Sequence, residues 1–259
     1  MNKLVLLSLI FSLVFTQVAF ADSLQFDFSG AVATSDIEGQ LQTPAGGQPN
    51  RSDLARPTFA ELGIDHLTSF ALEVGVRKGK HRIFLAAHAI RKSEHTVLPM
   101  DLLSQWQQFS TGDVVDTNIQ LDWHQLGYLR RFQVSDRLTY DLGADVTLFA
   151  FHYQLTNGTL QVDRRYNKGG YRLGGAINYS LTPQLTLNAS AFVPFQNGGA
   201  AEITTIDITG SYKISDSLST TLGVSFHDID FKDGQTFPNH IVARMEPRFS
   251  IGVSYHSNE

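Results

Sequence analysis

The sequence predicts an all-β fold, an antiparallel up-and-down transmembrane β-barrel of about ten strands with long external loops and short periplasmic turns. The first observation is that residues 114–153 form two long stretches in which polar and apolar side chains alternate, the period of an extended strand. The second is that the connections alternate between short and long. The third is that no run after residue 21 approaches the roughly twenty apolar residues of a spanning helix, so any insertion into a bilayer must use strands.

The N-terminus has the pattern of a cleaved secretory signal, which we predict to be residues 1–21. Lys3 precedes an apolar run of about a dozen residues, and Ala19 and Ala21 place small side chains where a signal peptidase reads them. This run is short for a membrane anchor. Residues 22–259 then form one barrel domain, exported through the periplasm to the outer membrane of a Gram-negative bacterium.

Composition excludes several kinds of site. The chain contains 0 Cys, so it has no disulfide, thiolate metal site or cysteine nucleophile. Loss of Lys3 with the signal changes the formal net charge from −5 to −6, because the mature chain keeps 19 of the 20 basic and all 25 acidic residues. An acidic chain of this kind is not expected to bind nucleic acid.

The predicted strands follow one another along the whole mature chain. The tight turns fall at 78–80, 135–136, 182–184 and 215–217, and the longer loops fall at 35–65, 92–113, 156–168, 196–201 and 228–240. This sorting by parity is typical of outer-membrane barrels and places both termini in the periplasm. The strands are residues 23–34, 69–77, 82–91, the two halves of 114–153, 171–181, 185–193, 203–214, 218–227 and 241–255.

The first two long loops contain short apolar elements. Residues 59–62 predict a turn, and Asp101 caps a predicted amphipathic helix over residues 101–109. One face of this helix could contact lipopolysaccharide or a protein partner, or it could fold down and plug the barrel mouth. That face consists of Leu102, Leu103, Trp106 and Phe109.

Tyrosines recur at one predicted depth of the barrel. Tyr140, Tyr179 and Tyr212 each lie on the outward face about four positions from a predicted periplasmic turn, and Tyr255 lies where the last strand leaves the membrane. A phenol stays hydrated while its ring is buried in lipid. The four residues therefore predict an aromatic girdle.

The signal peptide, the Ser-Asp turns within 133–138 and 214–218 and the terminal strand 248–255 resemble those of small OmpA-like outer-membrane β-barrel proteins. The resemblance covers the mature chain and implies that the barrel-assembly machinery recognises the last strand, where Val253 and Tyr255 match the family's final apolar pair. Ser250 stands where the family usually has glycine, and residues 256–259 extend past the final aromatic residue.

A polar cluster is predicted inside the barrel. With a two-residue turn at 135–136, Arg130 faces Asp141 across the strands and forms an internal ion pair. Asp122, His124 and Asp145 lie further up on the same face. They could form an acid–base dyad, but a narrow barrel also fills its interior with paired polar side chains. No serine or second motif accompanies the cluster, and no omptin-type or lipid A deacylase-type motif is present, so we predict no enzyme.

We also predict no metal and no cofactor. His227, Asp228, Asp230 and His240 could supply imidazole and oxygen ligands, but barrel rims are commonly rich in such residues. The predicted function is that of a non-enzymatic barrel whose external loops bind an external protein or small-molecule ligand, or support envelope integrity. The other predicted partners are outer-membrane lipid and lipopolysaccharide. The alternatives are a narrow small-solute pore and an envelope hydrolase using Asp122 and His124.

Overall fold

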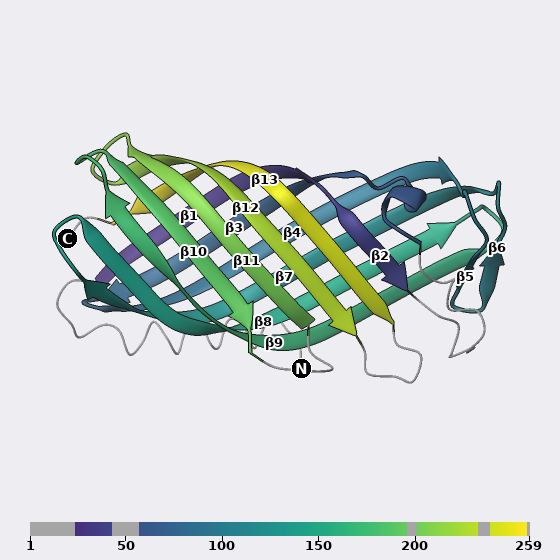
Figure 1. The fold of residues 1–259 in the computed structure, drawn as a ribbon, viewed down its shortest axis with the longest axis horizontal. Coiled ribbons are helices and arrows are strands. Elements are labelled where there is room, and N and C mark those ends of the chain that lie inside the picture. The colour runs from purple at the N-terminus through teal and green to yellow at the C-terminus, as the bar shows by residue number, and fades with distance from the viewer. Residues whose placement is uncertain (1–23, 43–56, 196–200, 233–238, 258–259) are drawn as a thin grey trace.

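The computed structural model describes residues 24–42, 57–195, 201–232 and 239–257, so the predicted signal peptide lies outside the described part. Ten antiparallel strands of the described part close into one barrel, because β13 pairs back onto β1 (Figure 1). The predicted all-β barrel is confirmed. The barrel strands are β1 (Leu24–Asp36), β3 (His66–Lys78), β4 (His81–Val97), β7 (Val114–Gln133), β8 (Leu138–Thr156), β9 (Gln161–Ser180), β10 (Leu185–Pro194), β11 (Ala201–Lys213), β12 (Leu218–Lys232) and β13 (His240–His256).

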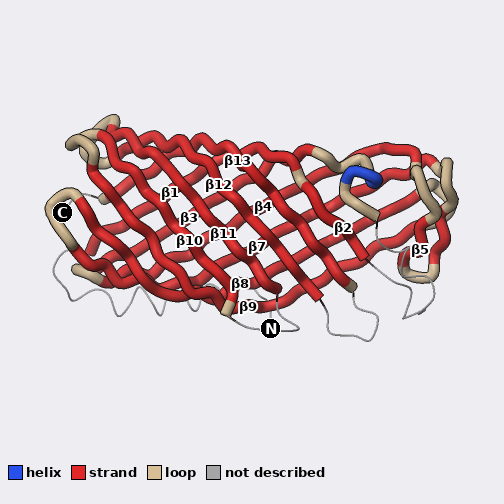
Figure 2. The backbone as a smooth tube through the Cα atoms, viewed as in Figure 1, coloured by secondary structure: helices blue, strands red, loops and turns tan. Residues whose placement is uncertain are grey.

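Three short strands and one helical turn complete the described fold. The barrel is elongated along its axis, with tight turns and the C-terminal end at one extremity and the helical turn at the other (Figures 1 and 2). We call the first extremity the short-turn end, which faces the periplasm in barrels of this kind. None of the helices in the described residues is long and apolar enough to cross a membrane. The additional elements are β2 (Glu38–Gln42), η3 (Ala60–Leu62), β5 (Leu102–Ser104) and β6 (Gln107–Phe109).

The half of the barrel nearer the short-turn end carries an apolar outer surface, and we call this half the stem. On β8, Leu142 and Leu148 point outward and are 53% and 59% exposed. Similar apolar side chains cover the outer face of every barrel strand at this level. They include Phe28, Phe70, Leu85, Leu126, Leu173, Leu187, Ile208, Leu222 and Ile251. A continuous exposed apolar belt over a polar interior is what a lipid-embedded barrel requires.

The other half has the opposite polarity, and we call it the head. Its described residues lie within 34–42, 57–68, 90–124, 149–170, 201–204 and 228–246. On β7, Val115, Ile119 and Trp123 are no more than 1% exposed and point inward, whereas Asp116 and Gln120 point outward. Side chains from β2, η3, β5 and β6 join those of the long strands in one buried apolar cluster. The head therefore has the apolar interior and polar exterior of a water-soluble protein.

The strands of the head form two sheets on opposite sides of this core. In one sheet β4, β7, β8 and β9 pair along their far halves, and in the other β11, β12, β13 and β2 pair. The pairing of β9 with β10 begins only at Arg172, and that of β4 with β3 ends at Ile90. Among the described residues no strand pairing joins the two sheets above these levels. The head is thus a sandwich built on a closed stem.

The predicted long loops are wrong in extent, because much of their sequence continues the strands. The loop predicted at 92–113 begins only after Val97, and the loop predicted at 156–168 is reduced to the link between Thr156 and Gln161. The loop predicted at 35–65 contains β2 and the helical turn η3, which matches the turn expected at 59–62. These segments did not look like strands because their polar face is the outer one, opposite to the pattern expected in lipid.

Candidate functional site

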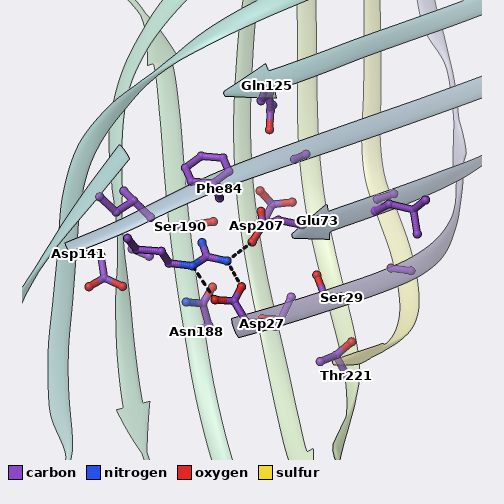
Figure 3. Close-up of a pocket in the computed structure, with 18 of the residues that line it drawn as sticks. Asp27, Ser29, Glu73, Phe84, Gln125, Asp141, Asn188, Ser190, Asp207 and Thr221 are labelled. Carbon is purple, nitrogen blue, oxygen red and sulfur yellow. Dashed lines mark hydrogen bonds and ion pairs between the residues drawn. The ribbon is translucent and has the colours of Figure 1, made fainter. Parts of the chain in front are cut away.

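The stem encloses a chamber of about 710 Å³, lined by polar side chains and by an apolar group of Phe84, Leu129 and Phe192. Its lining runs from Asp216 and His256 at the short-turn end to His88 and His227 beneath the head. Charged and amide side chains project into it from the surrounding strands, as Asp27, Glu73 and Asn188 show in Figure 3. The chamber therefore opens toward the short-turn end and ends below the apolar core.

Ion pairs cross the outer part of the chamber. The Arg82 guanidinium binds the carboxylates of Asp27 and Glu73, with Nη2 at 2.6 Å from Glu73 Oε1 (Figure 3). The Asp141 carboxylate accepts two hydrogen bonds from Arg131, through Nε and Nη2 at 2.9 Å each. Such forked pairs hold both side chains in one geometry, between the neighbouring strands β7 and β8 for Asp141 and across β3 for Asp27.

A third forked pair lies deeper and is almost fully buried. Arg172 donates through Nε and Nη2 to the two oxygens of Asp145 at 3.0 and 2.6 Å, and through Nη1 to Thr205 Oγ1 at 3.2 Å. The side chains of Arg172 and Asp145 are 3% and 0% exposed. A buried charge needs such a partner, so this pair ties β8, β9 and β11 together.

The inner end of the chamber contains a different cluster. Arg248 is 4% exposed and donates to Ser225 Oγ at 3.1 Å and Ser69 Oγ at 2.6 Å, and its Nη1 lies 2.9 Å from both ring nitrogens of His227. The Asp207 carboxylate lies 3.3 Å from His227 Nε2. We call these residues, together with His88 and Trp123 above them, the inner cluster.

The predicted ion pair between Arg130 and Asp141 is wrong by one residue. Arg130 pairs with Leu142 in the sheet and points outward, and Arg131 is the residue opposite Asp141. The connection between β7 and β8 spans residues 134–137, with Leu138 donating to the carbonyl of Ser135. This turn is longer than the two-residue turn that sequence indicates, and it shifts the register by one position.

The predicted cluster of Asp122, His124 and Asp145 does not form. Asp145 points into the chamber, but Asp122 and His124 lie on the outer face of β7, where the Asp122 carboxylate pairs with Arg91. The reason is the change of polarity along β7, because in the head the polar face of the strand is the outer one. A hydrolytic dyad of Asp122 and His124 is therefore not supported.

The predicted helix at 101–109 is wrong, because the segment forms the hairpin of β5 and β6. Leu102, Leu103 and Phe109 are 1%, 7% and 0% exposed and pack into the head, whereas Trp106 is 61% exposed. Ser104 hydrogen-bonds the Tyr153 phenol inside the core, and burial raises the pKa of that phenol above its usual range. This apolar face was expected either to plug the barrel mouth or to contact an external partner. Leu102, Leu103 and Phe109 pack inward as a plug would, and of the four residues Trp106 alone is exposed for an external contact.

The four tyrosines of the predicted girdle lie on the outer face near the short-turn end. Three of them pair with the first residue of a neighbouring strand: Tyr179 with Leu138, Tyr212 with Leu185 and Tyr255 with Leu218. Tyr140 lies two residues after the start of β8, and its ring stacks on that of Phe132 with the ring centroids 4.9 Å apart. That these rings sit at the lipid headgroups stays a prediction.

The four residues considered as metal ligands are separated in the fold. His227 belongs to the inner cluster, Asp228 lies opposite Arg244 on the outer face, and His240 Nε2 is 3.0 Å from Asp230. No three His, Asp or Glu side chains of the described residues are grouped as a metal site.

Sequence reasoning missed most of the chamber. It did not identify Arg82, His88, Asp207 or Arg248, although each is an ionisable residue in a strand that crosses the stem. An ionisable residue inside a membrane-spanning strand is a signal of an interior site, and this signal could have found all four.

Solved structures similar to this fold are outer-membrane β-barrels. The outer membrane protease OmpT from Escherichia coli aligns with a TM-score of 0.50 and 9% identity, covering 91% of this chain and 97% of its own. Ail from Yersinia pestis gives a TM-score of 0.41 and 8% identity over 91% and 100% of the two chains. Neisserial surface protein A gives 0.40 and 10% over 90% and 99%. The sequence matches no protein-family model and none of the curated proteins compared with it. The likeness to OmpT concerns the fold alone, and the chain therefore has the fold of an outer-membrane β-barrel.

Proposed function

We propose that the chain is a non-enzymatic outer-membrane barrel that acts at the cell surface through its head, by binding an external partner or by supporting the envelope. The observation that carries this proposal is the apolar core that fills the head. Side chains from eight of the ten barrel strands, all except β1 and β10, meet there, and Trp123, Phe149 and Phe231 are no more than 1% exposed. A filled core turns the external half of the barrel into a folded surface module.

The same core argues against the narrow pore, which is the alternative. A permeation path needs continuous polar or hydrated surface through the barrel. The chamber supplies such a surface only in the stem, and its lining ends at His88 and His227. Above them His88 stacks on Trp123 at 4.5 Å, and Trp123 belongs to the apolar core.

The connection between β4 and β7 offers contact points for a partner. Trp106 stands at the tip of the β5–β6 hairpin, and Val97 and Val114 face each other at the far end of the sheet with 57% and 47% exposure. Exposed tryptophan and valine side chains on an otherwise polar surface favour a binding role, since tryptophan is enriched among residues that dominate interface energies.

Conductance in planar bilayers tests this proposal. We expect the purified protein to give no stable single-channel steps. A matched variant lacks residues 99–112, whose removal is feasible because Leu98 N and Asp113 O already lie 2.9 Å apart. It should also stay silent, because strand side chains of the core remain. A channel of known conductance in the same bilayer shows that the assay works.

Stable steps from the wild-type protein would favour the pore instead. Steps from the shortened variant alone would show that the hairpin, and not the core of the strands, closes the barrel. The absence of enzymatic activity is checked separately, since cells overproducing the protein should keep an unchanged lipid A and peptide-cleavage profile.

A further inference from the structure

The inner cluster contains a buried cation without a carboxylate partner. Among the described residues, Arg82, Arg131 and Arg172 each have a carboxylate oxygen within 3 Å, whereas Arg248 contacts only two serines and His227. The nearest acid of the cluster, Asp207, bonds to His227 and not to Arg248. Asp207 therefore attracts Arg248 only through space, and a guanidinium that is 4% exposed without a directly bound anion is costly, because it has lost its hydration without gaining a charge-assisted hydrogen bond.

Three buried nitrogens of the same cluster have no hydrogen-bond partner. They are Arg248 Nε, His88 Nδ1 and Trp123 Nε1. The side chains that bear them are neighbours, since the His88 ring lies 4.5 Å from the Trp123 ring and 5.9 Å from the His227 ring, and His227 touches Arg248. Of the three, Arg248 and His88 line the chamber. Buried donors are normally satisfied, so the unpartnered N–H of Arg248, and that of His88 in its Nδ1–H tautomer, mark a place for an acceptor in the chamber.

The position of the cluster determines how an acceptor could arrive. Arg248, His88 and His227 line the same cavity as Asp216 and His256 at the short-turn end. The apolar core closes the opposite side. A solute would therefore enter from the periplasmic end and reach the cluster at the inner end of the chamber.

We propose that the inner cluster binds an oxyanion, namely the phosphate, sulfate or carboxylate group of a small periplasmic solute. Arg248 of β13 supplies the charge and an Nε–H donor, and His88 of β4 supplies a second nitrogen. An oxyanion fits better than water alone, because it brings several acceptor oxygens together with a negative charge that can bind Arg248 directly. This site does not depend on what the head binds.

Fluorescence of Trp123 provides the test, because its ring stacks on His88. The chain has 2 Trp, so the Trp106→Phe variant in detergent leaves Trp123 as the only reporter. We expect sodium phosphate to change its emission saturably, and sodium chloride at equal ionic strength to leave it unchanged. Sodium acetate in a third titration separates a carboxylate site from a phosphate site.

Two further variants in the Trp106→Phe background locate the site. Arg248→Gln should weaken phosphate binding at least roughly tenfold, because it removes a charge-assisted contact. Arg91→Gln removes an arginine on the outer face of the head, whose side chain is 50% exposed, and should bind phosphate unchanged.

If Arg248→Gln does not fold, His88→Phe keeps an aromatic ring beside Trp123 while removing the unsatisfied nitrogen, and it should also weaken binding. The proposal is overturned if the parent shows no saturable response to phosphate or acetate. It is equally overturned if the folded Arg248→Gln or His88→Phe variants bind as the parent does.

Discussion

Individual charged residues fix the register of the stem. Asp141 accepts from Arg131, and the deeper Asp145 accepts from Arg172, so two carboxylates of one strand bind arginines on its two neighbours. A slip of one residue would turn each of these charges toward lipid. The sequence did predict that Asp141 and Asp145 share a face, because they alternate with the apolar residues of β8. It could not select Arg131 over Arg130, because that choice depends on the length of one turn.

Asp145→Asn should destabilise the barrel by about 3–5 kcal/mol, because it leaves Arg172 buried without a counter-charge. Replacing both residues, as Asp145→Leu with Arg172→Met, should recover much of this loss. Urea unfolding in lipid vesicles measures the change. Asp122→Asn is the matched control, since the exposed pair with Arg91 should be worth about 1 kcal/mol or less. Equal losses at the two sites would contradict the structural role of the buried pair.

At the scale of elements, the β5–β6 hairpin shows why helical spacing was misleading. Leu102, Leu103 and Phe109 recur at intervals that suit one helix face, but a two-residue hairpin brings the same residues together from two strands. The turn residues Gln105 and Trp106 have φ angles of 48° and 68°, which residues other than glycine rarely adopt. Nothing in their identity signals such a turn, which usually contains Asn-Gly.

Replacing Gln105 by Asn and Trp106 by Gly should stabilise the head by about 1–2 kcal/mol, because both residues then suit the positive φ angles. Thermal unfolding of the purified protein in detergent measures this change. The same replacements placed at Ser135 and Asp136, in the β7–β8 turn that shows no positive φ, serve as a control and should not stabilise the protein. No gain at residues 105–106 would mean that the observed turn is not strained.

For the whole molecule, the decisive feature is the reversal of polarity between stem and head. From Val115 to Trp123 the apolar side chains of β7 point inward, whereas in the stem Leu126 and Tyr128 point outward and Leu129 is the apolar residue that stays inside, so the face that carries most of the apolar side chains changes within one strand. The barrel class could be predicted because ten alternating strands and the parity of their turns are preserved through this change. The inner cluster and the Asp122 side of β7 could not, because the same face of the strand was assumed to be apolar along its full length. The apolar face of a strand points outward where lipid surrounds it and inward where water does, so the inward face can be recognised only when the level of the membrane surface is known.

Arginine substitutions along the outer face of β7 should locate that surface. Leu126→Arg places a charge within the apolar belt and should cost about 2–4 kcal/mol at mid-membrane depth, less near the interface. Gln120→Arg, on the same face but in the head, should cost almost nothing. Folding in vesicles, read from the heat-modifiable band on gels, distinguishes them. Equal tolerance of both substitutions would place residue 126 outside the lipid.

The sandwich of the head also gives the two halves of the molecule different temperature responses. Burial of apolar surface from water produces the large heat-capacity change of unfolding, and its contribution to stability weakens on cooling. The head buries its core against water, whereas the outer belt of the stem is surrounded by lipid or detergent in the folded state. We therefore expect most of the heat-capacity increment to belong to the head. Cold, more than heat, should loosen the surface module first while the strands of the stem remain paired.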